Sequence, residues 1–362
     1  MNFRRAFMVF GALALTVSPS AFAQDANQGK AQAQSEQRKL SNDERREYIA
    51  LNELVDAVAA SKQPAPADLT LKFNHHFLKS NNNVYIPYIV EIGGGTFTSF
   101  PITMYVRAVP KGGAAATPAP AAAPKPGETP KAADAAPEWP FADAYFLEEK
   151  SLTTVGTVPA VARAMQLPPG EYTLYIAMRD KPGKDKKAPV KTVVLSQPLS
   201  VPDLNKGLTT SSIIVAKGLD PAAPGEQLTG QQQLEQPFTI SGYRITPSFA
   251  PTIPQSEELL FLFFIYNEGV AASGKPDLEV DYHFYRAAEE KPITRLATTA
   301  FNATTLPGQF DLKVGHQVFV GQGIPLKSAQ FTFEPGDYRL EIKITDKTNS
   351  QTLTRNVPFT VS

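Results

Sequence analysis

The sequence PGEYTLYI at residues 169–176 recurs as PGDYRLEI at residues 335–342. In both copies a Pro-Gly pair precedes a tyrosine and then apolar residues at alternate positions, which is typical of a turn leading into a half-buried strand. A tyrosine at this place in a β-sandwich often donates its hydroxyl to the backbone of the corner. The repeat therefore predicts one sandwich topology in both halves of the chain, with turns at Gly170 and Gly336 and tyrosine corners at Tyr172 and Tyr338.

An aspartate follows each copy of the repeat at the same offset, Asp180 in the first and Asp346 in the second. A short carboxylate side chain can accept hydrogen bonds from the backbone of the turn that follows it. Because no catalytic group lies near either copy in the sequence, we interpret the repeat as an element of the fold.

The second half of the chain consists of short apolar runs separated by turn residues. One of them, Glu258–Tyr266, is apolar almost throughout, as the central strand of a sheet is. About seven such runs describe an antiparallel sandwich. The predicted strands are 238–245, 258–266, 278–285, 293–300, 317–325, 338–345 and 352–361.

The first half shows the same pattern after a short helix. Ser41 and Glu44 have the spacing of a capping box, and a stripe of apolar residues to Val58 follows them. Pro87 cannot donate a ladder hydrogen bond, so its strand is expected at a sheet edge or with a bulge. The predicted strands are 69–73, 84–92, 100–109, 141–147, 171–179 and 190–201.

These patterns predict an all-β chain of two tandem immunoglobulin-like antiparallel β-sandwich domains with a short N-terminal helix. The composition agrees, since 32 prolines and 23 glycines punctuate short elements and 22 phenylalanines favour pleated surfaces. The expected segments are a signal peptide 1–23, a disordered leader 24–40, the helix 41–62, a first sandwich 67–205 with a disordered Ala/Pro insertion 110–138, a linker 206–236 and a second sandwich 237–362. Within the linker, Ser211–Ala216 is a candidate for the first strand of the second sandwich.

The N-terminus predicts export. Arg4 and Arg5 precede a short apolar stretch, and Ala21-Phe22-Ala23 offers small residues at a cleavage site before Gln24. We expect the mature protein to be periplasmic or secreted and to have no membrane span, because a spanning helix needs about 20 apolar residues. The absence of cysteine excludes disulfides and thiolate chemistry.

Charge and motifs exclude several classes of function. Lys+Arg and Asp+Glu both number 35, so the chain lacks the basic surplus of a nucleic-acid binder. No nucleophile elbow, phosphate loop or zinc-protease motif occurs. Asp281 and His283 share a strand face, as do Asp277, Glu279 and Asp281, but we read these as solvated pairs and predict neither a metal site nor a cofactor.

The chain resembles exported bacterial proteins of the VWFA-related acidobacterial type and their GWxTD-containing relatives, in which β-sandwich modules accompany another domain. The residues that carry the resemblance are Leu54–Ala57, Leu199–Leu204, Leu259–Asn267, Ile324–Leu326 and Pro335–Tyr338. The chain departs from that group because it has no Asp-x-Ser-x-Ser metal site, and because Pro140 follows its single tryptophan, Trp139. The resemblance therefore implies an architecture and no activity.

Three hypotheses of function follow. The first is a non-catalytic binding or scaffolding module for protein partners of the envelope, with Tyr85, Tyr88 and Phe97 as partner contacts. The second is a carbohydrate-binding or carbohydrate-active accessory protein that recognises polysaccharide through Trp139 and Tyr145 around Asp143. The third is a structural spacer. The sequence does not separate the first from the third.

Overall fold

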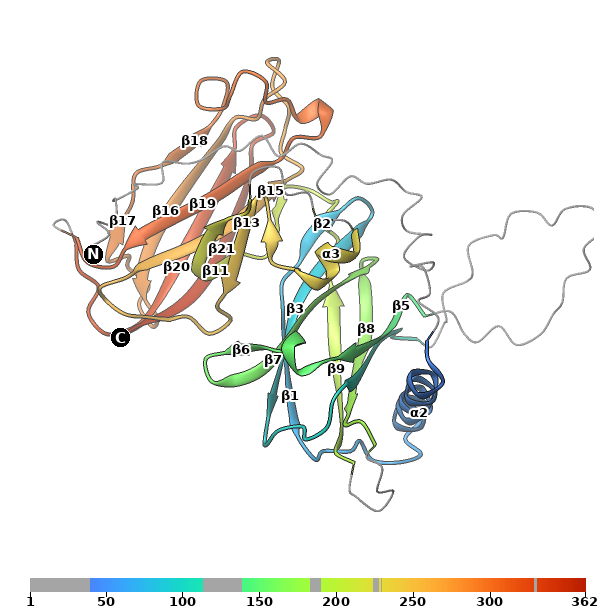
Figure 1. Cartoon of the computed structure of the whole chain (residues 1–362). Helices are drawn as coiled ribbons and strands as arrows, with labels where there is room; N and C mark the ends of the chain where they lie inside the picture. Colours follow the sequence, from blue (N-terminus) through green and yellow to red (C-terminus); the bar gives the residue numbers. More distant parts are fainter. Residues whose placement is uncertain (1–39, 113–138, 183–189, 224–227, 229, 329–330) are drawn as a thin grey trace, which may run out of the picture. The chain divides into compact units, whose positions relative to one another are not determined.

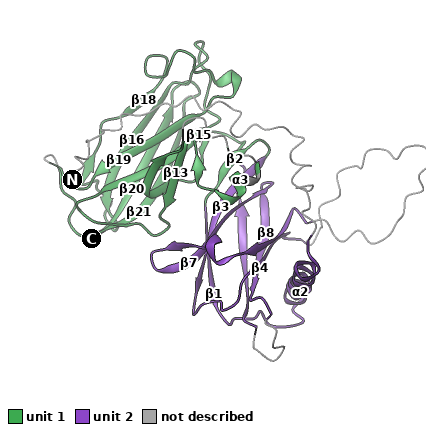
Figure 2. Ribbon diagram, in the orientation of Figure 1, with its two compact units in different colours: residues 1–25, 76–82, 204–362 green, residues 26–75, 83–203 purple. Residues whose placement is uncertain are grey.

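A computed structural model describes residues 40–112, 139–182, 190–223, 228, 230–328 and 331–362 (Figure 1). The expected signal peptide, nearly all of the leader and most of the Ala/Pro insertion lie outside the described residues. The chain forms two compact units, and each is built from β-sheets (Figure 2). Unit 1 holds His76–Asn82 and Leu204–Ser362, and the described part of unit 2 holds residues 40–75 and Asn83–Asp203.

In unit 2, two sheets form a sandwich. One sheet has the order β1 (Thr70–His75), β3 (Asn83–Gly93), β7 (Val158–Leu167) and β6 (Thr153–Val155). The other has the order β5 (Phe141–Leu147), β4 (Ile102–Pro110), β8 (Gly170–Arg179) and β9 (Thr192–Val201). All of these pairings are antiparallel.

In unit 1, one sheet is centred on β15 (Glu258–Tyr266), which pairs with β10 (Thr209–Thr210) and β11 (Ile214–Pro221) on one side and β19 (Val318–Pro325) on the other. Strands β13 (Tyr243–Pro247) and β12 (Thr239–Ile240) extend it beyond β11. The second sheet contains β14 (Thr252–Ile253), β21 (Gln351–Val361), β20 (Gly336–Asp346), β16 (Leu278–Arg286), β17 (Thr294–Arg295) and β18 (Thr299–Phe301).

The two sandwiches share one topology. The triplet β3, β4 and β8 of unit 2 corresponds to β15, β16 and β20 of unit 1, with β7 matching β19 and β9 matching β21. Each unit therefore has the strand order of an immunoglobulin-like sandwich, as the repeat predicted. One pairing departs from the antiparallel expectation, since β14 runs parallel to β21.

Helix α2 (Asn42–Ala59) covers the outer face of the β5-β4-β8-β9 sheet. Ser41 caps it with both bonds of a capping box. Leu51 and Val55 pack against Tyr105 and the small cluster around it. The buried Arg107 donates to Asp56 Oδ1 at 2.7 Å. The helix thus belongs to the sandwich, because both apolar burial and an ion pair attach it.

Several segments differ from expectation. Strand β7 was not predicted, because VPAVARAMQL is rich in alanine and contains a proline. The expected linker 206–236 contains β10, β11 and helix α3 (Gly230–Glu235), and β10 and β11 pair with β15. The run 238–245 is a hairpin of two strands, turned at Ser241-Gly242, whose φ angles are 52° and 76°. The other described elements are β2 (Leu78–Ser80) and the short 3-10 helices η2 (Glu149–Ser151) and η3 (Leu312–Val314).

Candidate binding site

The repeated tyrosines are structural. Tyr172 donates its hydroxyl to the carbonyl of Pro168 at 2.9 Å, and Tyr338 donates to Glu334 at 2.6 Å, which is the geometry of a tyrosine corner in both units. Both rings are buried. Gly336 has φ +146°, and a Cβ there would lie 3.2 Å from Arg286 Nη1, so this corner favours glycine.

The two repeated aspartates are buried and accept backbone hydrogen bonds. Asp180 accepts from the backbone N–H groups of Thr98 and Ser99 at 3.0 and 3.2 Å, which lie in the loop before β4 and not in the turn that follows β8. Asp346 accepts from Gly269 at 2.6 Å and from Thr348 at 2.9 Å, so it does reach the following turn. Each aspartate therefore fixes the loop that crosses between the two sheets of its unit.

The expected partner contacts Tyr85, Tyr88 and Phe97 are buried, with exposed fractions of 2%, 0% and 8%. The expectation was wrong because β3 is not an edge strand: β1 pairs with it on one side and β7 on the other, so Pro87 faces Ala164 within the sheet. Burial also raises the pKa of the Tyr85 and Tyr88 hydroxyls. These side chains belong to the core.

The expected sugar site does not form as one cluster. Trp139 lies over the guanidinium of Arg107, 4.9 Å from its ring centroid, and Arg107 contacts the helix on the outer face of the sheet. Tyr145 instead pairs with Met104 and lies against Arg163 of β7, on the opposite face of β5. Asp143 is exposed and shares the face of Tyr145. The strand alternation thus separates the tryptophan from the other two side chains.

The histidines and acidic residues are held by other partners. His283 lies 3.5 Å from Glu341 Oε1 on the neighbouring strand, and Asp281 accepts from Thr298 Oγ1 at 2.5 Å, so these two do not orient each other. Burial lowers the pKa of His75 to about 4. Within the described ranges, no group of three or more His, Cys, Asp or Glu side chains converges as metal ligands would.

A partly buried carboxyl lies in the loop after β15. The pKa of Glu268 is raised to about 7, mainly by burial and also by the nearby Asp346, while backbone hydrogen bonds and the charge of Lys79 act in the opposite direction. Its Oε1 atom is buried without a hydrogen-bond partner. Lys79 donates to Asn267 Oδ1 at 2.8 Å instead. The loop therefore holds a carboxyl group that the fold leaves poorly solvated.

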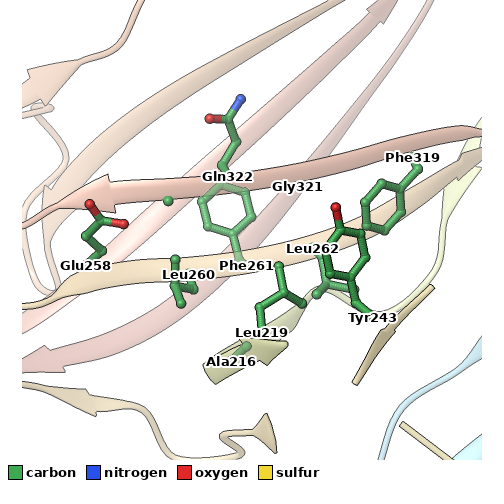
Figure 3. Close-up of a pocket in the computed structure, with 11 residues that line it drawn as sticks. Ala216, Leu219, Tyr243, Glu258, Leu260, Phe261, Leu262, Phe319, Gly321 and Gln322 are labelled. Carbon is green, nitrogen blue, oxygen red and sulfur yellow. The ribbon is translucent and has the colours of Figure 1, made fainter. Parts of the chain in front are cut away.

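A hollow of about 200 Å³ lies on the outer face of the sheet centred on β15 (Figure 3). Strand alternation explains its apolar lining: Phe261 and Phe263 point into the sandwich core, whereas Leu260 and Leu262 point outward. Figure 3 shows Leu262, Phe319 and Tyr243 gathered at one end and Glu258 at the other. The lining also includes Ala216, Leu219 and the backbone of Gly321 and Gly323.

The two glycines of β19 shape the hollow. Gly321 pairs with Leu262 and Gly323 with Leu260, so both occupy outward positions of the strand. At Gly323 the Glu258 carboxylate and Leu260 already occupy the space that a side chain would take, whereas the position of Gly321 is open. A Cβ at Gly321 would meet only the Phe319 ring, at 3.4 Å. Neither glycine has a left-handed φ, so the backbone conformation does not explain their presence.

Strand β19 is also an edge of its sheet. Its only strand partner in the described part of the chain is β15. An edge strand presents a row of N–H and C=O groups along its open side. An apolar hollow thus adjoins an open row of backbone donors and acceptors. The alternation of Gly321 and Gly323 is the signal of this site in the sequence, and it can be interpreted only when β19 is known to be an edge strand.

Comparison with known proteins yields no family. No family model matches the chain, and no curated protein matches it. Solved structures that align with it include red sea bream transglutaminase (11% identity, 84% of this chain and 33% of that chain, TM-score 0.19). Another is trypsin-activated α2-macroglobulin from Escherichia coli (12% identity, 82% of this chain and 17% of that chain, TM-score 0.21). A third is Salmonella α2-macroglobulin reacted with methylamine (11% identity, 83% of this chain and 17% of that chain, TM-score 0.19).

The chain spans a third or less of the length of these proteins. At such scores the alignments carry no argument about function, and the assignment of the fold rests on the strand pairing. In the residues that the structure describes, no helix has the length and apolar character needed to cross a membrane.

Proposed function

We propose that this protein is an exported, non-catalytic binding module that captures a protein partner by strand addition at the β19 edge. One observation carries the proposal: the open edge of β19 lies directly beside the apolar hollow. In strand addition, backbone hydrogen bonds supply affinity and pockets for alternate side chains supply specificity. The N-terminal sequence supports export, and the partner is therefore expected in the cell envelope.

In unit 2 the strand that corresponds to β19 is β7, and less of its edge is free for an added strand. Strand β6 pairs with the first residues of β7, from Val158 to Ala160. Farther along, Arg163 lies against the Tyr145 ring of β5, 5.4 Å from its centroid. The β7 edge is therefore partly occupied by its own unit, which favours β19 as the docking edge.

A photo-crosslinker tests the proposal. Benzoylphenylalanine at Tyr243 retains an aromatic ring in the wall of the hollow, and the same residue at Val314 serves as a control because that side chain is 59% exposed elsewhere in unit 1. Irradiated cells should yield a discrete protein adduct from position 243 and none from position 314. Identical adducts from both positions, or none from position 243, would refute capture at this edge.

A further inference from the structure

The outward face of β19 has room for a large side chain from an added strand. Directly opposed residues on neighbouring antiparallel strands have Cβ atoms about 4.5–5.5 Å apart. An aromatic side chain placed across from an edge glycine covers the exposed backbone and stabilises the pair. Gly321 provides such a position, and its neighbours Leu262 and Phe319 supply apolar contacts for a ring.

The other end of the hollow carries a negative charge. Glu258 is exposed, and its Oε2 atom lies 2.7 Å from where a Cβ of Gly323 would be, so the carboxylate lies over that glycine. Within the described chain, no hydrogen bond or ion pair is formed by the Glu258 carboxylate. A guanidinium or ammonium group opposite Gly323 would pair with it.

The register fixes the order of these two features. Glu258 pairs with Pro325 and Leu262 with Gly321, so the acidic end of the hollow lies toward the C-terminal end of β19. A strand that adds antiparallel to β19 reaches the acidic end first and Gly321 later. Residues opposite Gly323 and Gly321 are two apart on the added strand, and they share one face.

We propose that the partner segment of β19 is an extended stretch with the pattern basic-x-aromatic, in which the basic side chain pairs with Glu258 and the aromatic ring covers Gly321. The inference rests on the proposed function, because it names the partner chemistry of the same edge. Arginine and large aromatic residues are also the side chains that most often dominate protein interfaces.

A peptide selection tests the pattern. Displayed random decapeptides are selected on the full mature chain, and recovered peptides are measured against four variants. Gly321→Phe fills the hollow and Glu258→Lys reverses its charge. The matched controls are Gly308→Phe, where an added Cβ would meet nothing within 4 Å, and Glu257→Lys, which makes the same charge change at a neighbouring exposed residue outside the hollow.

Recovered peptides should share basic-x-aromatic and protect from hydrogen exchange those amides between Val318 and Ile324 that face the open side of β19. Gly321→Phe and Glu258→Lys should each weaken binding about tenfold or more, whereas the controls should change it less than about twofold. Absence of selected peptides, a different order or spacing, or equal binding to Gly321→Phe would overturn the inference. The inference would also be overturned if the parent chain bound a soluble polysaccharide and Gly321→Phe abolished that binding.

The two proposals fail separately. If position 243 yields protein adducts in cells while the selection returns no basic-x-aromatic peptide, the partner pattern is wrong and strand addition stands. If position 243 yields no adduct, the proposed function is wrong whatever the selection returns. Circular dichroism of each variant first establishes that the sandwich is intact.

Discussion

Glu268 makes the stability of unit 1 depend on pH in an unusual direction. Burial raises the pKa of its carboxyl from 4.5 to about 7 in the folded protein, whereas the unfolded chain keeps the ordinary value. Between pH 4.5 and 7 the folded state therefore binds more protons than the unfolded state. This contribution to stability is fully present below pH 4.5 and is lost as the pH rises through 7.

The magnitude follows from the shift. Moving the pKa from 4.5 to about 7 corresponds to about 3 kcal/mol. Most of this cost is the desolvation of the carboxylate, and the charge of Asp346 adds to it. Hydrogen bonds from the backbone of Glu268 and Val318, together with the charge of Lys79, offset part of it. Glu268→Gln removes the charge and keeps the shape. It should stabilise unit 1 by about 2–3 kcal/mol at pH 8 and leave it nearly unchanged at pH 4.5.

Hydrogen exchange of peptides from β15 and β19 is the appropriate assay, because the single tryptophan, Trp139, lies in unit 2 and does not report on unit 1. Glu257→Gln is the control, since that side chain is exposed. A stability difference between Glu268→Gln and the parent that stays constant from pH 4.5 to 8 would refute the assignment of a raised pKa.

Three further changes test other parts of the fold. Tyr338→Phe should destabilise unit 1 by about 1–3 kcal/mol in denaturant unfolding, because it leaves the corner carbonyl without its donor; an unchanged midpoint would contradict the tyrosine corner. Asp56→Ala should destabilise unit 2 more than Arg107→Met, because Asp56→Ala leaves a buried guanidinium without its ion-pair partner, whereas Arg107→Met leaves only an exposed carboxylate unpaired. Trp139 fluorescence during unfolding reports the stability of both variants, and the opposite ranking would be inconsistent with the ion pair. Because burial disfavours the imidazolium form of His75, unit 2 of the parent should lose stability as the pH falls from 6.5 to about 4. His75→Gln should remove this loss. Equal acid sensitivity of the variant and the parent would argue against a lowered pKa of His75.

The sequence predicted those parts of the fold in which local pattern and tertiary structure agree. The Pro-Gly-x-Tyr repeat predicted equivalent strands in the two halves, and β8 and β20 start at that motif. The apolar run 258–266 predicted a central strand, and β15 has neighbours on both sides. In each case the residues that determine the local conformation also face the core.

Prediction failed where pairing with distant residues determines the result. Pro87 indicated that its strand, β3, lies at a sheet edge, but β7 pairs with β3 on the second side. The alanine-rich sequence of β7 has no strand signal of its own. The same error placed Tyr85 and Tyr88 on the surface. The hollow was missed for a related reason: the meaning of Gly321 and Gly323 depends on which strands lie beside β19, and a single sequence does not contain that information.

The assignment of His76–Asn82 to unit 1 has a consequence for how this architecture can be inherited. Phe77 and Ser212 exchange two hydrogen bonds of 2.8 Å, and the backbone of Lys79 donates to the Tyr266 hydroxyl at 3.2 Å. The coding sequence of one unit is therefore interrupted by that of the other. A gene fragment that begins at Leu204 omits the seven residues His76–Asn82 and the hydrogen bonds that they form with Ser212 and Tyr266. We therefore expect that a genetic event which transfers this sandwich intact carries the coding sequence of both units, or supplies an equivalent segment in another way.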